Sequence, residues 1–195
     1  MQYGIIGRAA RLILTGELIL IKKILIILII AGVYFYFKTP STDSIVRNMS
    51  IDETKGTIEC KGTVYDAGWA YAKVYKGDIR YVGRAYHKDA PYITYDAIVT
   101  TGDFSDPSLV RVTPIRNGNM SWSASKKPDG TLIVLHFIPA NKTVNDDLKR
   151  LKTGDKVELA GREESDSKIT ASDGNFVGLG HDNHKFFLLK SVRRI

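Results

Sequence analysis

The sequence predicts a mainly β protein, in which an N-terminal transmembrane helix precedes a small barrel, similar to the oligonucleotide/oligosaccharide-binding (OB) kind, or a sandwich, with one short helix. Two observations predict this fold class. An uncharged apolar run, ILIILIIAGVYFYF, occupies residues 24–37. From residue 56 onward, β-branched and aromatic residues alternate with polar ones, and turn residues separate the runs. Many short strands without room for crossover helices favour a barrel or sandwich over a parallel sheet.

Composition supports a packed domain and excludes several classes of protein. The 195 residues are 44% hydrophobic and 25% charged, which is typical of globular chains. The single cysteine, Cys60, cannot form an internal disulfide, and four histidines are few for a metal site with several ligands. We therefore expect no cofactor and no metal.

The net charge of +7 belongs mostly to the N-terminus. Residues 1–38 hold five basic residues and one acidic residue, or +4, which leaves +3 for the remainder. A charge of +3 is too small for the electrostatic footprint of a nucleic-acid-binding domain. Nucleic acid is therefore not an expected partner.

The apolar run predicts a transmembrane signal anchor over residues 17–38. Its fourteen uncharged residues span about 21 Å as a helix, against about 30 Å of hydrocarbon core. A second apolar run at 18–21 lies just upstream and is separated only by Lys22 and Lys23. Their long stems can carry the ammonium groups to the headgroup layer, so a span of about twenty residues fits.

The flanks of the run predict how the anchor is oriented. Tyr34 and Tyr36 belong to an aromatic cluster of the kind that lies at the membrane–water interface, and Lys38 follows it. Basic residues precede the run in a modest excess, which favours a cytoplasmic N-terminus and a C-terminal domain in the periplasm or outside the cell. A cleaved signal peptide, a buried helix of a soluble protein and an inverted topology remain alternatives.

These signals divide the chain into four parts. Residues 1–16 are expected to form a cytoplasmic tail or an interfacial amphipathic helix. The anchor over 17–38 precedes a polar linker over 39–44, and residues 45–195 form an extracytoplasmic β-domain. The lipid bilayer of the cytoplasmic membrane is thus the first predicted partner.

Nine strands and one helix are predicted in the β-domain. Residues 76–78, Lys-Gly-Asp, predict a hairpin turn between two of the strands, and residues 127–130, Lys-Pro-Asp-Gly, predict a turn before the longest apolar strand. Residues 144–152 predict a helix that Thr143 caps, with acidic residues in its first turn and basic ones in its last. The strands are expected at 56–64, 70–75, 79–86, 92–100, 109–115, 120–125, 131–138, 156–163 and 185–195.

Two segments of the β-domain resemble a family of uncharacterised bacterial proteins. The stretch 135–163 and the closing segment 185–195 are similar to the C-terminal part of that family, whose members have one N-terminal membrane span and an exported β-domain. The resemblance implies this membrane-anchored architecture and no activity. The matching positions are His136, Ile138, Pro139, Ala140, Gly154, Asp155, Val157 and Gly161.

Candidate catalytic residues are sparse. His181 and His184 have a spacing that suits a metal only if the segment is helical. Because they lie in a glycine-rich loop, we expect them to be solvated loop histidines. His136, within an apolar strand, is expected to be a core or edge residue rather than a base. Serines and lysines gather at 121–127, which leaves a membrane-tethered hydrolase of the serine/lysine peptidase type as an alternative.

Aromatic and basic residues interleave along 65–95 and predict a binding surface. Stacking and charge on such a surface suit a partner protein or a polymer. We therefore expect a non-enzymatic binding, scaffold or assembly module whose partner is another membrane or envelope protein. An OB-like binder of glycan or nucleic acid is a further alternative. The predicted binding residues are Trp69, Tyr71, Lys73, Tyr75, Arg80, Tyr81, Arg84 and Tyr86.

Overall fold

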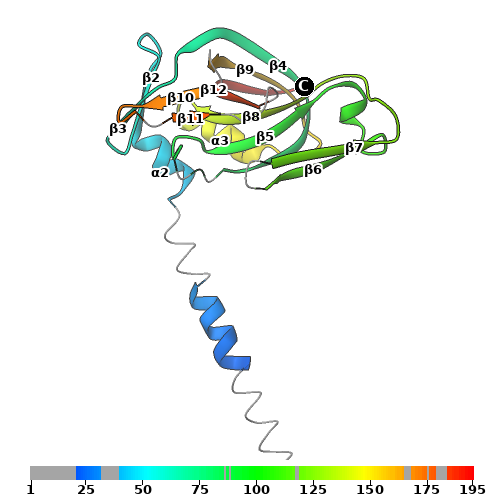
Figure 1. Ribbon diagram of the computed structural model, residues 1–195, viewed down its shortest axis with the longest axis horizontal. Helices are drawn as coiled ribbons and strands as arrows, with labels where there is room; N and C mark the ends of the chain where they lie inside the picture. Colours follow the sequence, from blue (N-terminus) through cyan, green and yellow to red (C-terminus); the bar gives the residue numbers. More distant parts are fainter. Residues whose placement is uncertain are drawn as a thin grey trace, which may run out of the picture. The chain divides into compact units, whose positions relative to one another are not determined.

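The computed structural model describes residues 21–31, 40–85, 87, 89–116, 119–164, 168–174, 176–178 and 184–195. The chain divides into two units, Met1–Ser41 and Thr42–Ile195. In the first unit, residues 21–31 form a helix (Figure 1). Among the described residues, no helix is both long enough and apolar enough to cross a membrane. The anchor expected over 17–38 extends beyond both ends of this helix into residues outside the described ranges, so it stays a prediction.

The second unit is mainly β, as predicted, and five of its strands close into a barrel (Figure 1). Around the barrel the order is β12-β8-β5-β4-β9. The pairs are antiparallel except for β8 and β12, which run parallel. Of the barrel and sandwich alternatives, the closed barrel is the one observed. Its strands are β4 (Trp69–Arg84), β5 (Tyr95–Thr100), β8 (Leu132–Pro139), β9 (Lys156–Glu164) and β12 (His184–Arg194).

One apolar cluster fills the barrel. It includes Ala97 and Val99 of β5 and Leu135 and Phe137 of β8, which alternate with residues that point outward. Helix α3 (Lys142–Arg150), between β8 and β9, adds Val144 and Leu148 to the same cluster. The helix predicted at 144–152 is therefore confirmed in type and place.

The start of α3 differs from the prediction. Asn141, rather than Thr143, is the N-cap, and its Oδ1 accepts a hydrogen bond from the backbone N–H of Val144 at 3.1 Å. The helix thus begins two residues earlier than expected, because Asn is at least as good an N-cap as Thr. A short helix that the sequence did not predict, α2 (Thr42–Arg47), precedes the first strand, and Asn145 of α3 donates to Asp43 of α2 at 2.9 Å.

Strand β4 corrects the prediction of a turn at residues 76–78. It runs without a break through its sixteen residues. A Cβ at Gly77 would lie 2.3 Å from the carbonyl oxygen of Thr100 on β5, so glycine is needed here for a close approach between two strands rather than for a hairpin. The turn predicted at 127–130 is consistent with the structure, since Gly130 has a φ of 106° just before β8.

Two smaller sheets cover the outside of the barrel. A five-stranded sheet, ordered β1-β2-β3-β10-β11, packs on one part of it, and the hairpin of β6 and β7 with the 3-10 turn η1 (Gly102–Ser105) packs on another (Figure 1). Both covers contribute apolar side chains to shared clusters. Their strands are β1 (Met49–Asp52), β2 (Thr57–Cys60), β3 (Thr63–Asp66), β6 (Val110–Arg116), β7 (Asn119–Ala124), β10 (Lys168–Ala171) and β11 (Phe176–Gly178).

Truncating the helix that packs into the barrel should destabilise the protein. Leu148→Ala removes a buried side chain from the barrel cluster, and we expect it to lower the free energy of unfolding by about 3 kcal/mol. Urea denaturation of the full chain in detergent measures this. The matched control is Lys152→Ala, at an exposed position just after α3, for which we expect a change within about 0.5 kcal/mol. Equal effects of the two substitutions would contradict the packing described.

Candidate functional site

A row of polar side chains lies on the outer face of the barrel, between its two covers. Asp96 on β5 stands directly opposite His136 on β8. The neighbouring outward pair, Ile98 and Val134, packs under the β6–β7 hairpin, whereas Ile138, two residues beyond His136, packs under the five-stranded sheet. Because apolar contacts flank the row on both sides, Asp96 and His136 are buried although they lie outside the barrel.

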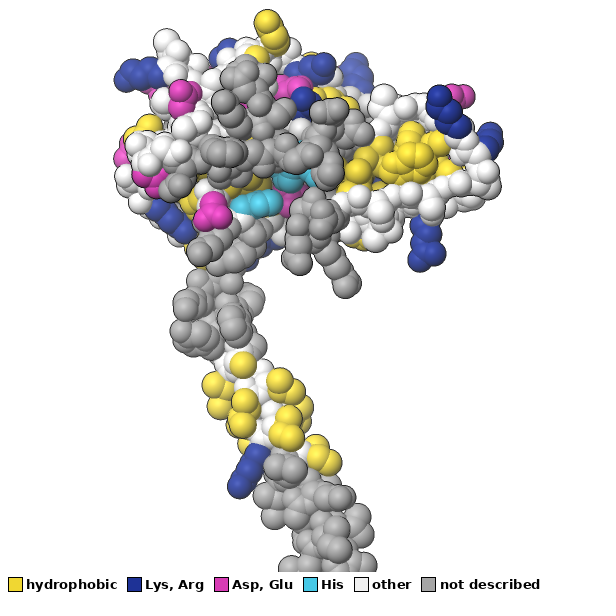
Figure 2. Space-filling model, in the orientation of Figure 1, with side chains coloured by type: hydrophobic (Ala, Val, Ile, Leu, Met, Phe, Trp, Pro, Cys, Tyr) yellow, Lys and Arg dark blue, Asp and Glu magenta, His cyan; other side chains and the backbone are white. Residues whose placement is uncertain are grey.

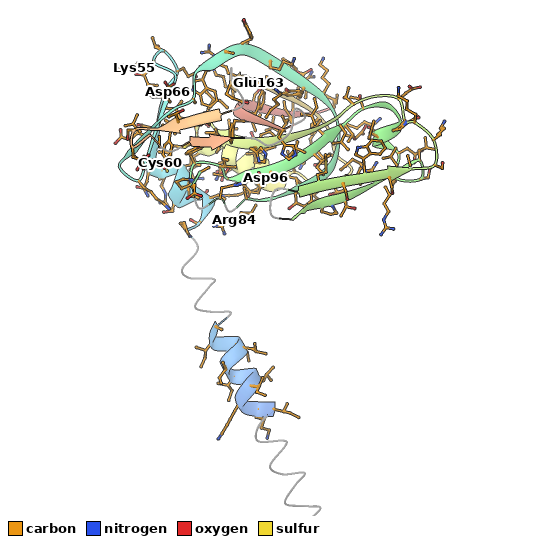
Figure 3. All side chains as sticks on the ribbon, in the orientation of Figure 1. Lys55, Cys60, Asp66, Arg84, Asp96 and Glu163 are labelled. Carbon is orange, nitrogen blue, oxygen red and sulfur yellow. The ribbon has the colours of Figure 1, made fainter. Side chains whose placement is uncertain are left out.

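Asp96 is hydrogen-bonded to two histidines. Its Oδ1 lies 2.7 Å from His136 Nδ1, and its Oδ2 lies 3.2 Å from His87 Nε2. His87 comes from the segment that joins β4 to β5, and its side chain is 28% exposed. Figure 3 labels Asp96 near the middle of the second unit, and Figure 2 shows histidine side chains at the surface there, beside an acidic one. The cluster therefore reaches solvent through His87.

His184, the first residue of β12, extends the cluster. Its Nδ1 lies 3.2 Å from His136 Nε2, and its side chain is buried. Both ring nitrogens of His136 thus have a polar neighbour. A proton on Nδ1 of His136 is donated to Asp96, whereas a proton on Nε2 is donated to His184, so the ring can present a lone pair on either side.

The Asp96 carboxyl group is held in its charged form. Burial favours the neutral form of a carboxyl group and opposes ionisation here. The hydrogen bonds from His136 and His87, together with the charges of these histidines, outweigh burial and lower the pKa of Asp96 below its usual value. The cluster therefore contains a buried anion with two imidazole rings directed at it.

This arrangement suits two kinds of chemistry. The ligand atoms of His87, Asp96 and His136 lie within 4.8 Å of one another, and imidazole nitrogens with a carboxylate oxygen form a donor set for divalent transition metals. A carboxylate that orients a histidine is also the arrangement of a general base. The cluster is therefore the part of the described structure where several reactive groups converge.

The sequence indicated two of these four residues, but not as a cluster. His136 was predicted to be a core or edge residue, which its burial confirms, and His184 was paired with His181 as solvated loop histidines. That prediction is wrong for His184, which is buried at the start of β12 beside His136, whereas His181 lies outside the described residues. His87 and Asp96 were missed. Asp96 did give a signal in the sequence, because it places a charged residue within the apolar strand predicted at 92–100. A carboxylate at a buried position in such a strand needs hydrogen-bond partners.

Four of the predicted binding residues are buried or half-buried. Trp69 and Tyr75 are buried, and the Tyr75 hydroxyl donates to Glu163. Arg80 donates to backbone carbonyls in η1 and β6, and Tyr81 packs against the hairpin cluster. These four side chains therefore serve the packing of β4 in the described structure.

The other predicted binding and anchor residues are exposed or undescribed. Tyr71 is 83% exposed, and Lys73 and Arg84 are exposed as well. Within the described part of the predicted surface, Tyr71 is thus the exposed aromatic residue. Lys22 and Lys23 are exposed on the helix at 21–31. Four predicted residues lie outside the described ranges: Tyr34, Tyr36, Lys38 and Tyr86.

A groove of about 400 Å³ lies on the outside of the barrel, where β4, β9 and β12 run side by side. Lys73, Arg162 and Lys190 line it together with small and apolar residues. Glu53 lies 2.5 Å from Lys190 and 3.6 Å from Arg162. Three basic groups against one acidic group leave the groove positively charged.

The serine- and lysine-rich segment does not form a catalytic arrangement in the described residues. Ser121 and Ser123 lie exposed on β7, and Lys126 and Lys127 are exposed in the turn that follows. A lysine general base needs a desolvated environment that lowers its pKa. This segment is therefore better described as a solvated hairpin end.

Comparison with known protein families, with curated proteins and with solved structures finds no match for this chain.

A buried carboxyl group near the end of β9 should make stability depend on pH. Burial raises the pKa of Glu164 to about 8 from an ordinary value of 4.5. Between these two pH values the folded state keeps a proton that the unfolded state has released, so stability falls as pH rises. We expect Glu164→Gln to remove most of this loss and to stabilise the protein by roughly 2–4 kcal/mol at about pH 8.5.

Urea denaturation at about pH 5 and about pH 8.5 measures the effect. Glu59→Gln, at an exposed position on β2, is the control and should leave the pH dependence unchanged. If Glu164→Gln has the same pH dependence as the unsubstituted chain, burial of a raised-pKa carboxyl group is not the cause.

Proposed function

We propose that this protein is a single-pass membrane protein that displays an OB-like barrel outside the cytoplasmic membrane and binds an acidic segment of another envelope protein, without catalysis. Five strands closed into a barrel, with β4, β5 and β8 paired antiparallel in chain order and followed by α3, support the OB-like class. Folds of this class bind extended ligands such as oligonucleotides and oligosaccharides. An OB-like fold leads us to expect a binding function. The kind of ligand must be inferred from the side chains on the surface of this barrel.

The groove between β4, β9 and β12 is the observation that carries this proposal. Its floor is made of small residues such as Ala72, Ala160 and Gly161, which leave space for the side chains of a ligand. Val74 lines the groove and is 51% exposed, and the exposed Tyr71 precedes the lining residue Ala72 in the chain. Exposed apolar and aromatic side chains of this kind are typical of protein interfaces, in which aromatic residues supply much of the contact area.

The charge of the groove selects the kind of partner. Within the part of the chain that the structure describes, Lys73 pairs with no carboxylate, and its Nζ lies 5.7 Å from the centre of the Tyr75 ring. Lys190 and Arg162 share one carboxylate, that of Glu53. A ligand with acidic side chains can pair with Lys73 and compete for the shared cations, and such pairs steer association and fix its register.

Site-specific photo-crosslinking tests the groove. A photoreactive residue replaces Val74 in the full chain, and the chain is irradiated in intact cells. We expect one discrete protein adduct whose crosslinked peptide, mapped by mass spectrometry, is rich in Asp and Glu. Charge reversal by Lys73→Glu and Lys190→Glu should lower the adduct yield at least about tenfold, because both changes oppose an acidic ligand.

A matched valine and a matched lysine provide the controls. Val64 on β3 is 42% exposed and does not line the groove, so a photoreactive residue there should not give the same adduct. Lys127→Glu on the hairpin side should leave the Val74 adduct unchanged. Equal labelling from both valines, or an adduct that survives both groove substitutions, contradicts the proposal. A glycan or nucleic-acid adduct would favour the alternative of a polymer binder.

Membrane attachment is the second part of the proposal. Its support is the apolar run at 24–37 with its basic and aromatic flanks. Anchoring confines the barrel near the membrane and so raises its effective concentration toward a membrane-bound partner. A modest affinity at an open groove is then sufficient for function.

Fractionation and protease access test the attachment. The full chain should remain in membranes after an alkaline carbonate wash, and deletion of residues 17–38 should release it. Protease added to spheroplasts should degrade the β-domain while a cytoplasmic marker protein stays intact. A chain that fractionates with soluble proteins, or a β-domain protected in spheroplasts, would overturn the proposed location.

A further inference from the structure

We propose that His87, Asp96 and His136 bind a divalent transition-metal ion, with zinc as the representative ion, and that His184 positions His136 for this role. The inference is independent of the groove, because none of these residues lines it. It adds a metal centre to a protein for which the sequence predicted none.

The ligand atoms are already gathered at nearly the spacing that zinc requires. Four ligands at about 2.1 Å around a tetrahedral ion stand about 3.4 Å apart. The 3.2 Å between His87 Nε2 and Asp96 Oδ2 is close to this spacing. The 2.7 Å between His136 Nδ1 and Asp96 Oδ1 is a hydrogen bond, and it needs to lengthen by less than about 1 Å to admit an ion.

The three ligands come from separate parts of the fold that the barrel holds in place. Asp96 and His136 are cross-strand neighbours on β5 and β8, so their separation is fixed by the ladder of hydrogen bonds. His87 lies in the segment between β4 and β5, three residues after β4 ends, and its ring stands edge-on to that of His136, with centres 5.5 Å apart. Two ligands thus come from paired strands of the barrel and the third from the segment that connects β4 to β5.

His184 fixes the side of His136 that faces the metal. When His136 Nδ1 binds an ion, the ring proton lies on Nε2, which can donate it to His184 Nδ1 at 3.2 Å. A hydrogen bond from the second nitrogen of a ligating histidine orients the ring and makes it a stronger ligand. This role accounts for a second buried histidine beside the first.

The chemistry of the donors favours a transition metal over calcium or magnesium. Imidazole nitrogens suit zinc and related ions, whereas magnesium and calcium prefer oxygen ligands alone. The charge of Asp96 offsets part of the ion's charge in a buried site. Zinc sites with three protein ligands leave the fourth coordination position to water or to a bound molecule.

Zinc titration of the full chain tests the proposal. The chain, without a histidine tag, is purified in detergent, treated with a chelator and titrated with ZnCl2 in isothermal calorimetry, with MgCl2 as a parallel arm. We expect one zinc ion bound per chain, no heat of binding with magnesium, and a raised melting temperature with zinc, because an ion that binds only the folded state stabilises it. Cobalt should give the visible ligand-field absorption of a site with nitrogen ligands.

Two substitutions and one control locate the site. His87→Ala and Asp96→Asn should each weaken zinc binding by more than about 100-fold, since the first removes a direct ligand and the second replaces an anionic carboxylate ligand with a weak neutral amide. Asp89→Asn changes an exposed carboxylate only two residues from His87 and should leave the affinity unchanged. His87→Ala is the main test, because this partly exposed side chain can be removed without opening the core. Circular dichroism verifies that each variant is folded.

A further measurement needs no variant. Diethyl pyrocarbonate modifies accessible imidazoles, and a saturating zinc concentration should protect the peptide that carries His87 from modification. The proposal is overturned if no zinc binds at one equivalent, if His87→Ala retains the affinity of the unsubstituted chain, if Asp89→Asn weakens binding as much, or if zinc leaves the modification of His87 unchanged.

Discussion

The structure depends on the burial of both faces of strands β5 and β8 and of the first half of β12. In β5, five of the six residues are buried, and in β8 seven of the eight are. The inward faces are covered by the rest of the barrel and by α3, but the outward faces need separate covers. The five-stranded sheet and the β6–β7 hairpin supply these covers. The need to cover the outward faces explains why the barrel carries so many additional strands. Any polar side chain on these outward faces is buried too, and it must find its partners there.

Asp96 and His136 satisfy this requirement together, and so the site is a consequence of the fold. A buried carboxylate with no partner strongly destabilises a fold. Here the carboxylate receives hydrogen bonds from His136 and His87, which lower its pKa in spite of burial. Glu164 shows the opposite outcome, because burial dominates at its carboxyl group and raises the pKa to about 8. Asp96 is thus a buried acid that its two histidine partners stabilise in the charged form, whereas Glu164 is a source of pH-dependent instability.

Local sequence patterns predicted most strands and α3. Contacts between residues distant in sequence determined the continuity of β4 and the position of the histidine cluster. Alternation predicted most strands, and capping residues with amphipathic spacing predicted α3, because both signals lie within one element. The break expected at Gly77 was wrong, since a glycine at a turn and a glycine under a neighbouring carbonyl look alike in sequence. The cluster of His87, Asp96 and His136 was missed because 49 residues separate its first and last members. The register of β5 against β8 brings them together, and no local pattern encodes it.

The groove and the cluster can act separately although β12 belongs to both. His184 begins this strand beside the cluster, and Lys190 lines the groove. Six residues of strand place them roughly 20 Å apart, beyond the screening length of about 8 Å at physiological salt. Charge reversal at Lys190 should therefore leave the electrostatics of the cluster nearly unchanged, and an ion at Asp96 should not repel a ligand in the groove. An effect of metal on groove binding would have to pass through the backbone of β12, because the first residue of this strand lies beside His136 and its seventh residue lines the groove.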